Sequence, residues 1–114
     1  MTSPDHVFVN DFGTPNAVTT FLDGSTRAIA QIGPTWIGRG NYLPGWRWSR
    51  HVKPMHGQRS ASHAGYVLSG ALAVQDASGV EVVVRSGQAF YATPGHDAWV
   101  IGDEPCEALD IPVA

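Results

Sequence analysis

The residues best suited to do chemistry in this sequence are its histidines. Four of the five lie between positions 51 and 96, namely His51, His56, His63 and His96. A neutral imidazole nitrogen is the commonest metal donor in proteins near pH 7, and a metal site needs three or four donors that converge from separate elements. A metal centre is therefore the first chemistry that this spacing indicates, whereas we interpret His6 as a surface residue.

Short β-strands are the elements that must position these histidines. The 13 glycines and 8 prolines are spread along 114 residues, and this density argues against a helical bundle. From Arg27 onward, runs rich in strand-forming residues alternate with turn signals. The predicted strands are 27–32, 36–43, 46–52, 65–68, 72–75, 80–85, 89–92, 98–101 and 107–111. Strands of this length and spacing predict an all-β sandwich or barrel.

Length and composition narrow the possible partners and location. A chain of 114 residues is typical of one domain, and 43% hydrophobic with 15% charged residues is typical of a globular protein. A net charge of -3 gives no reason to expect nucleic acid or an anionic membrane as a partner. No apolar run approaches the roughly 20 residues of a membrane helix, and the first five residues lack signal-peptide features, so we expect a cytoplasmic protein. The single cysteine, Cys106, excludes an intramolecular disulfide, and we expect it to be a small buried hydrophobe.

The segment from His56 to Gly70 resembles the first motif of the cupin superfamily, G(x)5HxH(x)3–4E(x)6G. In that motif the two histidines and the glutamate are metal ligands. His56 falls at the first histidine, Gln58 at the second and His63 at the glutamate, and Gly70 stands at the final glycine.

A rival register of the first motif begins at Gly45. It places His51 at the first histidine and Lys53 at the second, where a lysine would repel a cation. We therefore prefer the register with His56 as a ligand and interpret His51 as a pocket or rim residue.

The segment from Gly87 to Trp99 resembles the second cupin motif, G(x)5PxG(x)2H(x)3N. The usual histidine position is Ala98 here, and His96 lies two residues earlier. Residues two apart share one face of a strand, so His96 is still expected to point into the barrel. The stretch 94–105 also looks like a recurring signature of small bacterial cupins.

The resemblance implies a fold and an assembly. It implies a double-stranded β-helix (jelly-roll) barrel over residues 26–114, preceded by an N-terminal arm at residues 1–25. The arm is expected to be irregular and to pack on the barrel or on a dimer partner. Members of this superfamily often pair in this way, so a homodimer is expected.

Carried onto this sequence, the resemblance implies a divalent metal ion held by His56, His63 and His96, with Gln58 as a weaker amide-oxygen ligand. Imidazole-rich sites suit Zn, Fe, Ni or Cu, and the sequence does not choose among these metals. Because three such ligands are neutral and the first motif supplies no carboxylate, the metal would keep most of its charge and attract an anionic substrate.

A basic segment is expected to supply part of the substrate site. Five of the seven basic residues lie between positions 39 and 59, and no acidic residue lies between Asp23 and Asp76. This pattern indicates either an exposed basic face or a mouth that attracts an anion. Asp97 is expected to orient His96 or to act as a general base. The residues that we expect to contact a small-molecule substrate are Arg47, Trp48, His51, Tyr66, Asp97 and Trp99.

Two main functions from different classes follow from these expectations, because a fold does not fix a function. The first is a metal-dependent isomerase, decarboxylase or dioxygenase that acts on a small organic substrate. The second is a metal-free module that binds or senses a small molecule in the same barrel mouth, and Gln58 and Ala98, which replace the usual ligands, favour it. A third, weaker hypothesis is a subunit whose main role is dimerisation through the N-terminal arm.

Overall fold

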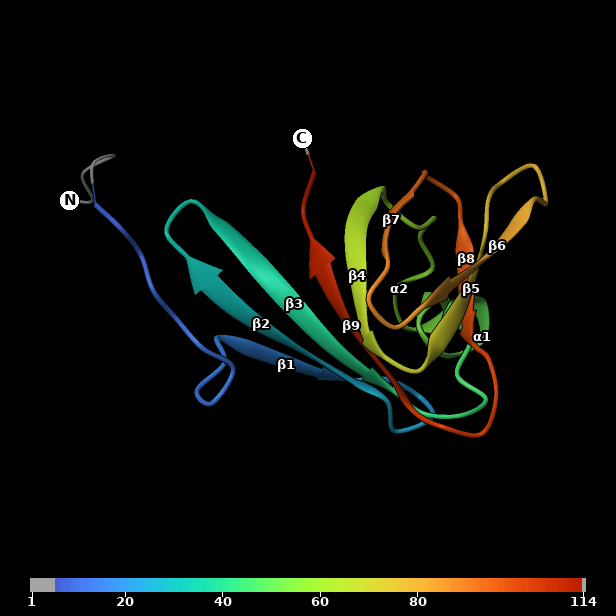
Figure 1. Cartoon of the computed structure of the whole chain (residues 1–114), viewed down its shortest axis with the longest axis horizontal. Helices are drawn as coiled ribbons and strands as arrows, with labels where there is room; N and C mark the ends of the chain where they lie inside the picture. Colours follow the sequence, from blue (N-terminus) through green and yellow to red (C-terminus); the bar gives the residue numbers. More distant parts are fainter. Residues whose placement is uncertain (1–5, 114) are drawn as a thin grey trace.

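This computed structural model describes residues 6–113 of the chain. They contain nine short strands and two single-turn helices (Figure 1). No helix in that range is long and apolar enough to cross a membrane. In chain order the elements are β1 (Ala17–Thr20), β2 (Thr26–Ile32), β3 (Thr35–Tyr42), α1 (Trp48–His51), α2 (Lys53–His56), β4 (His63–Ser69), β5 (Ala71–Gln75), β6 (Glu81–Arg85), β7 (Ala89–Ala92), β8 (Asp97–Val100) and β9 (Cys106–Ile111).

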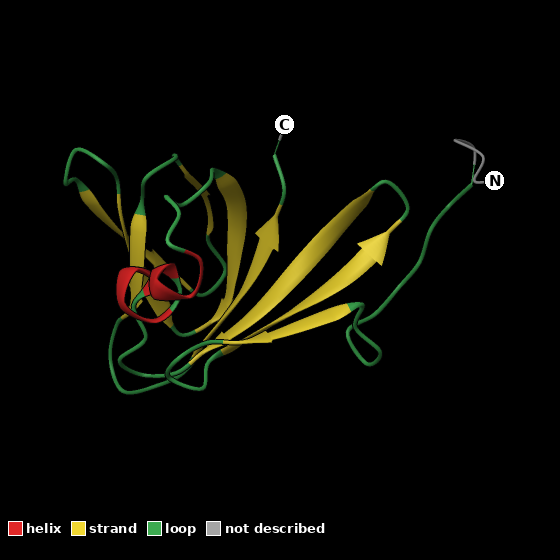
Figure 2. Cartoon of the chain, turned by 180° about the vertical axis from the view of Figure 1, so that it is seen from behind, coloured by secondary structure: helices red, strands yellow, loops and turns green. Residues whose placement is uncertain are grey.

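The strands form two antiparallel sheets. One sheet has six strands in the order β1-β2-β3-β9-β4-β7, and the other has three in the order β6-β5-β8. From β4 onward the chain passes repeatedly from one sheet to the other, as in a jelly roll. Figure 2 shows that the sheets lie closest at one end and spread apart at the other, with both helices beside the three-stranded sheet. The predicted all-β jelly-roll class is confirmed.

The core lies between the two sheets. The rings of Tyr42 and Trp46 have centroids 4.2 Å apart, and Phe21 packs against both. Alternate residues of β9 are buried, beginning with Cys106 and ending with Asp110, which is the pattern of a strand with one face in the core. This strand therefore brings a carboxyl group, as well as apolar side chains, into the interior.

The crossing from β4 to β5 requires a glycine. Gly70 has φ +77°, and a Cβ at this position would lie 2.5 Å from the carbonyl oxygen of Pro105 and 2.9 Å from the Cα of Cys106. Any other residue would be strained in this conformation and would also collide with the backbone. The close approach keeps the end of β4 against the start of β9, which are neighbours in the six-stranded sheet.

The strand predicted at residues 46–52 is wrong, because Trp48–His51 form α1, whereas Arg47 makes an isolated β-bridge to Trp99. The amide of His51 donates to the carbonyl of Arg47 at 2.9 Å, and Pro54 lies in the first turn of α2, where its missing N–H leaves no donor unpaired. The carboxylate of Asp97 on β8 accepts an α1 amide at 3.0 Å. This long-range bond, which local sequence does not reveal, outweighs the strand preference of the aromatic residues.

The predicted irregular arm at residues 1–25 contains a strand. Residues 1–5 lie outside the described part of the chain, but β1 pairs along its whole length with β2. Three of its four residues are β-branched, and such residues favour strands. Val7 and Val9, nearer the N-terminus, are 90% and 89% exposed. Packing of the arm on a dimer partner stays a prediction.

Cys106 provides a test of the core. Burial raises the pKa of its thiol to about 11, and the neighbouring Glu107 carboxylate adds to the shift. Since the thiolate is the reactive form and the side chain is fully buried, we expect no reaction of the folded protein with a chromogenic disulfide reagent at pH 8. The denatured chain should react with one equivalent, and Cys106→Ala should not react in either state. Equal rates for the folded and denatured chain would contradict this placement.

Candidate functional site

A cavity of about 560 Å³ lies between the two sheets, within the size range of small-molecule sites. Trp36, Trp46, Trp48 and Phe90 give its wall a large aromatic surface. Its ionisable side chains include Arg27, His56, Arg59, His63, His96 and Asp110. The four residues predicted as metal ligands all lie in this wall, namely His56, Gln58, His63 and His96.

Asp110 is the buried carboxyl group around which the polar part of the wall is arranged. It lies on β9 between two glycines of the neighbouring strands, Gly38 of β3 and Gly65 of β4, and is 8% exposed. Arg27 Nη1 approaches its Oδ2 at 3.5 Å, and His63 Nε2 approaches its Oδ1 at 3.4 Å. These partners are needed because an unpaired charge in the interior is strongly unfavourable.

Two buried hydrogen-bond donors of this wall lack an acceptor within residues 6–113. Arg27 Nε and Trp46 Nε1 are buried and have no hydrogen-bond partner within residues 6–113. Burial raises the pKa of Tyr42 well above its ordinary value, and the neighbouring Asp110 carboxyl group, with which it shares a hydrogen bond, raises it further, so the hydroxyl stays protonated and serves Asp110. Buried donors are normally paired in folded proteins, so this wall favours a ligand that supplies acceptor oxygens.

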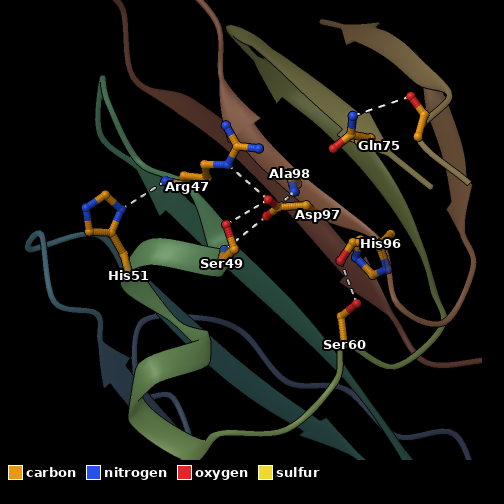
Figure 3. Close-up of polar contacts among 9 residues, drawn as sticks. Arg47, Ser49, His51, Ser60, Gln75, His96, Asp97 and Ala98 are labelled. Carbon is orange, nitrogen blue, oxygen red and sulfur yellow. Dashed lines mark hydrogen bonds and ion pairs between the residues drawn. The ribbon is translucent and has the colours of Figure 1, made fainter. Parts of the chain in front are cut away.

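His63 and His96 come together from different parts of the chain. His63 begins β4, His96 precedes β8, and their ring centroids are 5.1 Å apart. Desolvation lowers the pKa of His96, although its contact with Thr93 opposes the shift, so the ring is neutral near pH 7. Its Nδ1 lies 2.8 Å from the Thr93 carbonyl oxygen, which leaves Nε2 for a ligand when Nδ1 carries the proton. The Ser60 hydroxyl donates to the His96 carbonyl at 2.6 Å and fixes this turn (Figure 3).

The predicted metal ligands share the cavity but do not converge. His56 ends α2 instead of lying on a strand, so it is exposed at the rim; its ring lies 5.8 Å from that of Trp48, and its Nδ1 accepts the Gln58 amide at 3.0 Å. His63 Nε2 is directed towards Asp110. Within residues 6–113, no three His, Cys, Asp or Glu side chains are grouped so that they could hold a metal ion. The expected meeting of three imidazoles is therefore not found, and these donors do not fit a three-ligand metal centre.

Asp97 holds the helical segment against β8 (Figure 3). Its carboxylate accepts hydrogen bonds from Arg47 Nε at 2.9 Å, from the Ser49 amide at 3.0 Å and from the Ser49 hydroxyl at 2.7 Å. The Arg47 guanidinium also lies over the Trp99 ring, 4.3 Å from its centroid, a favourable cation–π arrangement. His51 Nδ1 accepts the Arg47 amide at 2.9 Å. Both oxygens of Asp97 are thus engaged in positioning α1.

The residues predicted to contact a substrate do not lie in one place. Trp48 lies in the cavity wall. Four others belong to the network around Asp97 and lie outside that wall; they are Arg47, His51, Asp97 and Trp99. Tyr66 is on β4 and is 37% exposed. Substrate contact by these residues stays a prediction.

Two charged residues of the wall, Arg27 and Asp110, were not predicted as site residues, and Arg59 was expected only as a member of the basic segment 39–59. Asp110 carried a signal, because it occupies an inward position of the predicted strand 107–111, and a charged residue on a buried face is uncommon without a partner. Arg59 lies in a loop and carried no periodic signal. Its Nη2 donates to the Pro94 carbonyl at 3.2 Å, and a Cβ at Gly95 would lie 2.5 Å from its Nε.

Comparisons with known proteins concern the family and the fold. Residues 48–112 match the family model described as Cupin domain, and no curated protein matches the chain significantly by sequence. A solved structure of a protein of unknown function from Acinetobacter sp. ADP1 is similar, with 18% identity, a TM-score of 0.65, and coverage of 97% of this chain and 98% of that chain.

Two other solved structures are also similar in fold. One is that of a sugar phosphate isomerase of a cupin superfamily, from Silicibacter pomeroyi. It has 14% identity and a TM-score of 0.63, and the match covers 90% of this chain and 74% of that chain. The other is Drosophila melanogaster CENP-C bound to CAL1, with 16% identity, a TM-score of 0.62, and coverage of 83% of this chain and 74% of that chain. At these identities the likeness concerns the fold alone.

The Asp97 network generates a stability prediction. Burial alone would raise the pKa of Asp97, but hydrogen bonds from Ser49 and Arg47 outweigh it and hold the pKa below its ordinary value of 3.8. Such a carboxylate stabilises the folded state above its ordinary pKa, and this contribution is lost as the pH falls through the lower folded-state pKa. We expect Asp97→Asn to lower the free energy of unfolding at pH 7 by on the order of 2 kcal/mol.

Denaturant unfolding at pH 7 and at acidic pH checks this expectation. The Asp97→Asn variant should lose less stability than the wild type below about pH 4, because the titrating group is gone. The control is Asp103→Asn, which removes an exposed carboxyl group between β8 and β9. It should change neither the free energy of unfolding at pH 7 nor the loss of stability at acidic pH. An Asp97→Asn variant with wild-type stability at pH 7 would contradict the role of this network.

Proposed function

The chain belongs to the cupin domain family, and we propose that the cavity between its two sheets binds a small organic molecule that carries a carboxylate or similar anionic group. The observation that carries the proposal is the imbalance of charge in the cavity wall. Arg27 and Arg59 each contribute a permanent positive charge. Asp110 is the one acidic side chain of the wall within the described residues, so the cavity favours an anion.

Arg27 is the residue best placed to hold the anionic group. Its contact with Asp110, at 3.5 Å, is long for a charge-assisted hydrogen bond, and its buried Nε lacks a partner within residues 6–113. A guanidinium presents a planar fork of donors that matches a carboxylate. The Arg27 side chain is 38% exposed, so a ligand carboxylate would pair with the exposed guanidinium N–H groups that Asp110 leaves free.

His63 is the residue best placed to exchange a proton with such a ligand. Asp110 lies 3.4 Å from its Nε2, and a carboxyl group beside an imidazole fixes the orientation of the ring. The Phe90 ring meets His63 edge-on, with centroids 5.8 Å apart, and restricts its movement. The proposed function corresponds to the metal-free binding module, with His63 as the acid–base group if the bound molecule is converted.

Benzoate is a suitable probe for this proposal. We expect it to bind with a Kd near or below about 1 mM and at least about ten times more tightly than benzyl alcohol, because only benzoate can pair with Arg27. Arg27→Gln should weaken benzoate binding by about tenfold or more, since it removes the cation and leaves Asp110 to repel the ligand. Isothermal titration calorimetry measures both affinities.

The matched control for this test is Arg85→Gln. Arg85 is an exposed arginine on β6, and its replacement changes the net charge equally without altering the cavity. It should bind benzoate like the wild type. Equal binding of benzoate and benzyl alcohol, or an unchanged benzoate affinity in Arg27→Gln, would count against the proposed function.

A second candidate function is metal-assisted chemistry beside His63 and His96. The sequence predicts Zn, Fe, Ni or Cu on His56, Gln58, His63 and His96, and the observation that favours this candidate is the 5.1 Å separation of the His63 and His96 rings. The lack of a third converging donor within residues 6–113 counts against it. We therefore derive no chemical step from a metal.

Metal analysis decides between the two candidates. We expect protein purified without a nickel column to carry well under one equivalent of transition metal. Excess chelator should leave its melting temperature unchanged, because only removal of a stabilising ligand lowers stability. One equivalent of metal that is lost in His63→Ala and in His96→Ala, but kept in the surface control His6→Ala, would overturn the metal-free proposal.

A further inference from the structure

A second, smaller pocket adjoins the main cavity. A slot of about 360 Å³ lies between β6 and β7. It shares three wall residues with the main cavity, which are Val74, Phe90 and His96. The main cavity and the slot therefore adjoin at these three side chains.

The slot exists because two edge strands are not paired with each other. β6 pairs with β5 in the three-stranded sheet, and β7 pairs with β4 in the six-stranded sheet. Val80, Val82 and Val84 line the slot from the side of β6. Val84 is 5% exposed, whereas Val82 and Val80 are 57% and 59% exposed. An apolar wall thus continues from the interior to the surface.

The chemistry of the slot differs from that of the main cavity. No arginine or lysine lines it in the described part of the chain, so it offers no guanidinium or ammonium group to an anion. Its acidic residue, Asp76, is engaged in its own turn, where it accepts the Ser78 amide at 2.9 Å, the Ser78 hydroxyl at 2.6 Å and the Val80 amide at 3.0 Å. The slot therefore suits a hydrocarbon group.

We propose that the slot takes the alkyl chain of an amphipathic monocarboxylate whose head group lies near Arg27 in the main cavity. This inference rests on the proposed function and specifies the class of ligand. Phe90 stands where the two spaces adjoin, and its ring lies close over β4 because residue 65 is glycine: a Cβ there would be 2.4 Å from the ring. The shared wall favours one ligand that occupies both spaces over a protein segment that covers the rim.

A series of straight-chain carboxylates from butanoate to octanoate tests this inference. In calorimetric titrations of the full chain, we expect the affinity to rise roughly two- to fourfold with each added methylene, as burial of that group in an apolar site predicts. Val82→Asp places a charge in the slot. It should abolish the gain with chain length while leaving butanoate affinity within about twofold of the wild type.

Val83→Asp is the matched control, because Val83 is the next residue of β6 and its side chain points to the opposite face. It should keep the dependence on chain length. If butanoate binds and responds to Arg27→Gln but longer chains bind no better, the slot inference is overturned and the proposed function stands. If no carboxylate binds, the proposed function itself fails. If Val82→Asp changes the oligomeric state in light scattering but not the chain-length dependence, the slot is a contact between copies and the inference is overturned.

Discussion

The burial of Asp110 between the sheets is the constraint on which the polar half of the cavity depends. A carboxyl group that has lost its water must be surrounded by cations or donors, and Arg27 and His63 supply them from β2 and β4. Two glycines, Gly38 and Gly65, flank it on the adjacent strands, so no side chain from these positions fills the space beside it. The inward-facing position of Asp110 on β9 thus constrains which residues of β2, β3 and β4 lie beside it in the cavity wall.

The fold was largely predictable because turn residues and alternation are local signals. The predicted strands 72–75 and 107–111 match β5 and β9 to within one residue at each end. The failure at 46–52 has a physical cause, since the bonds from Ser49 to Asp97 join residues almost fifty positions apart. Strand β1 was missed because Pro15 and Gly24, two turn-forming residues, lie close on either side of it and indicated an irregular arm.

The candidate site was predictable in its location and less so in its chemistry. The two motifs placed His56, His63 and His96 around one cavity, because motif spacing fixes which strand or loop carries a residue. Spacing does not fix the direction of a side chain, and His56 ends a helical turn at the rim. Arg27 and Asp110 lie outside both motifs, so an interpretation centred on the motifs overlooked Asp110, which faces His63, and Arg27, which pairs with Asp110.

The aromatic wall of the cavity has an optical consequence. Trp36, Trp46 and Trp48, three of the four tryptophans in the sequence, line the main cavity, and the fourth, Trp99, lies beneath the Arg47 guanidinium. The intrinsic emission of this protein therefore reports on the polarity of its interior pocket and on the docking of α1, rather than on an average over the surface. Tryptophan fluorescence of the unlabelled protein therefore provides a direct signal for occupancy of the cavity.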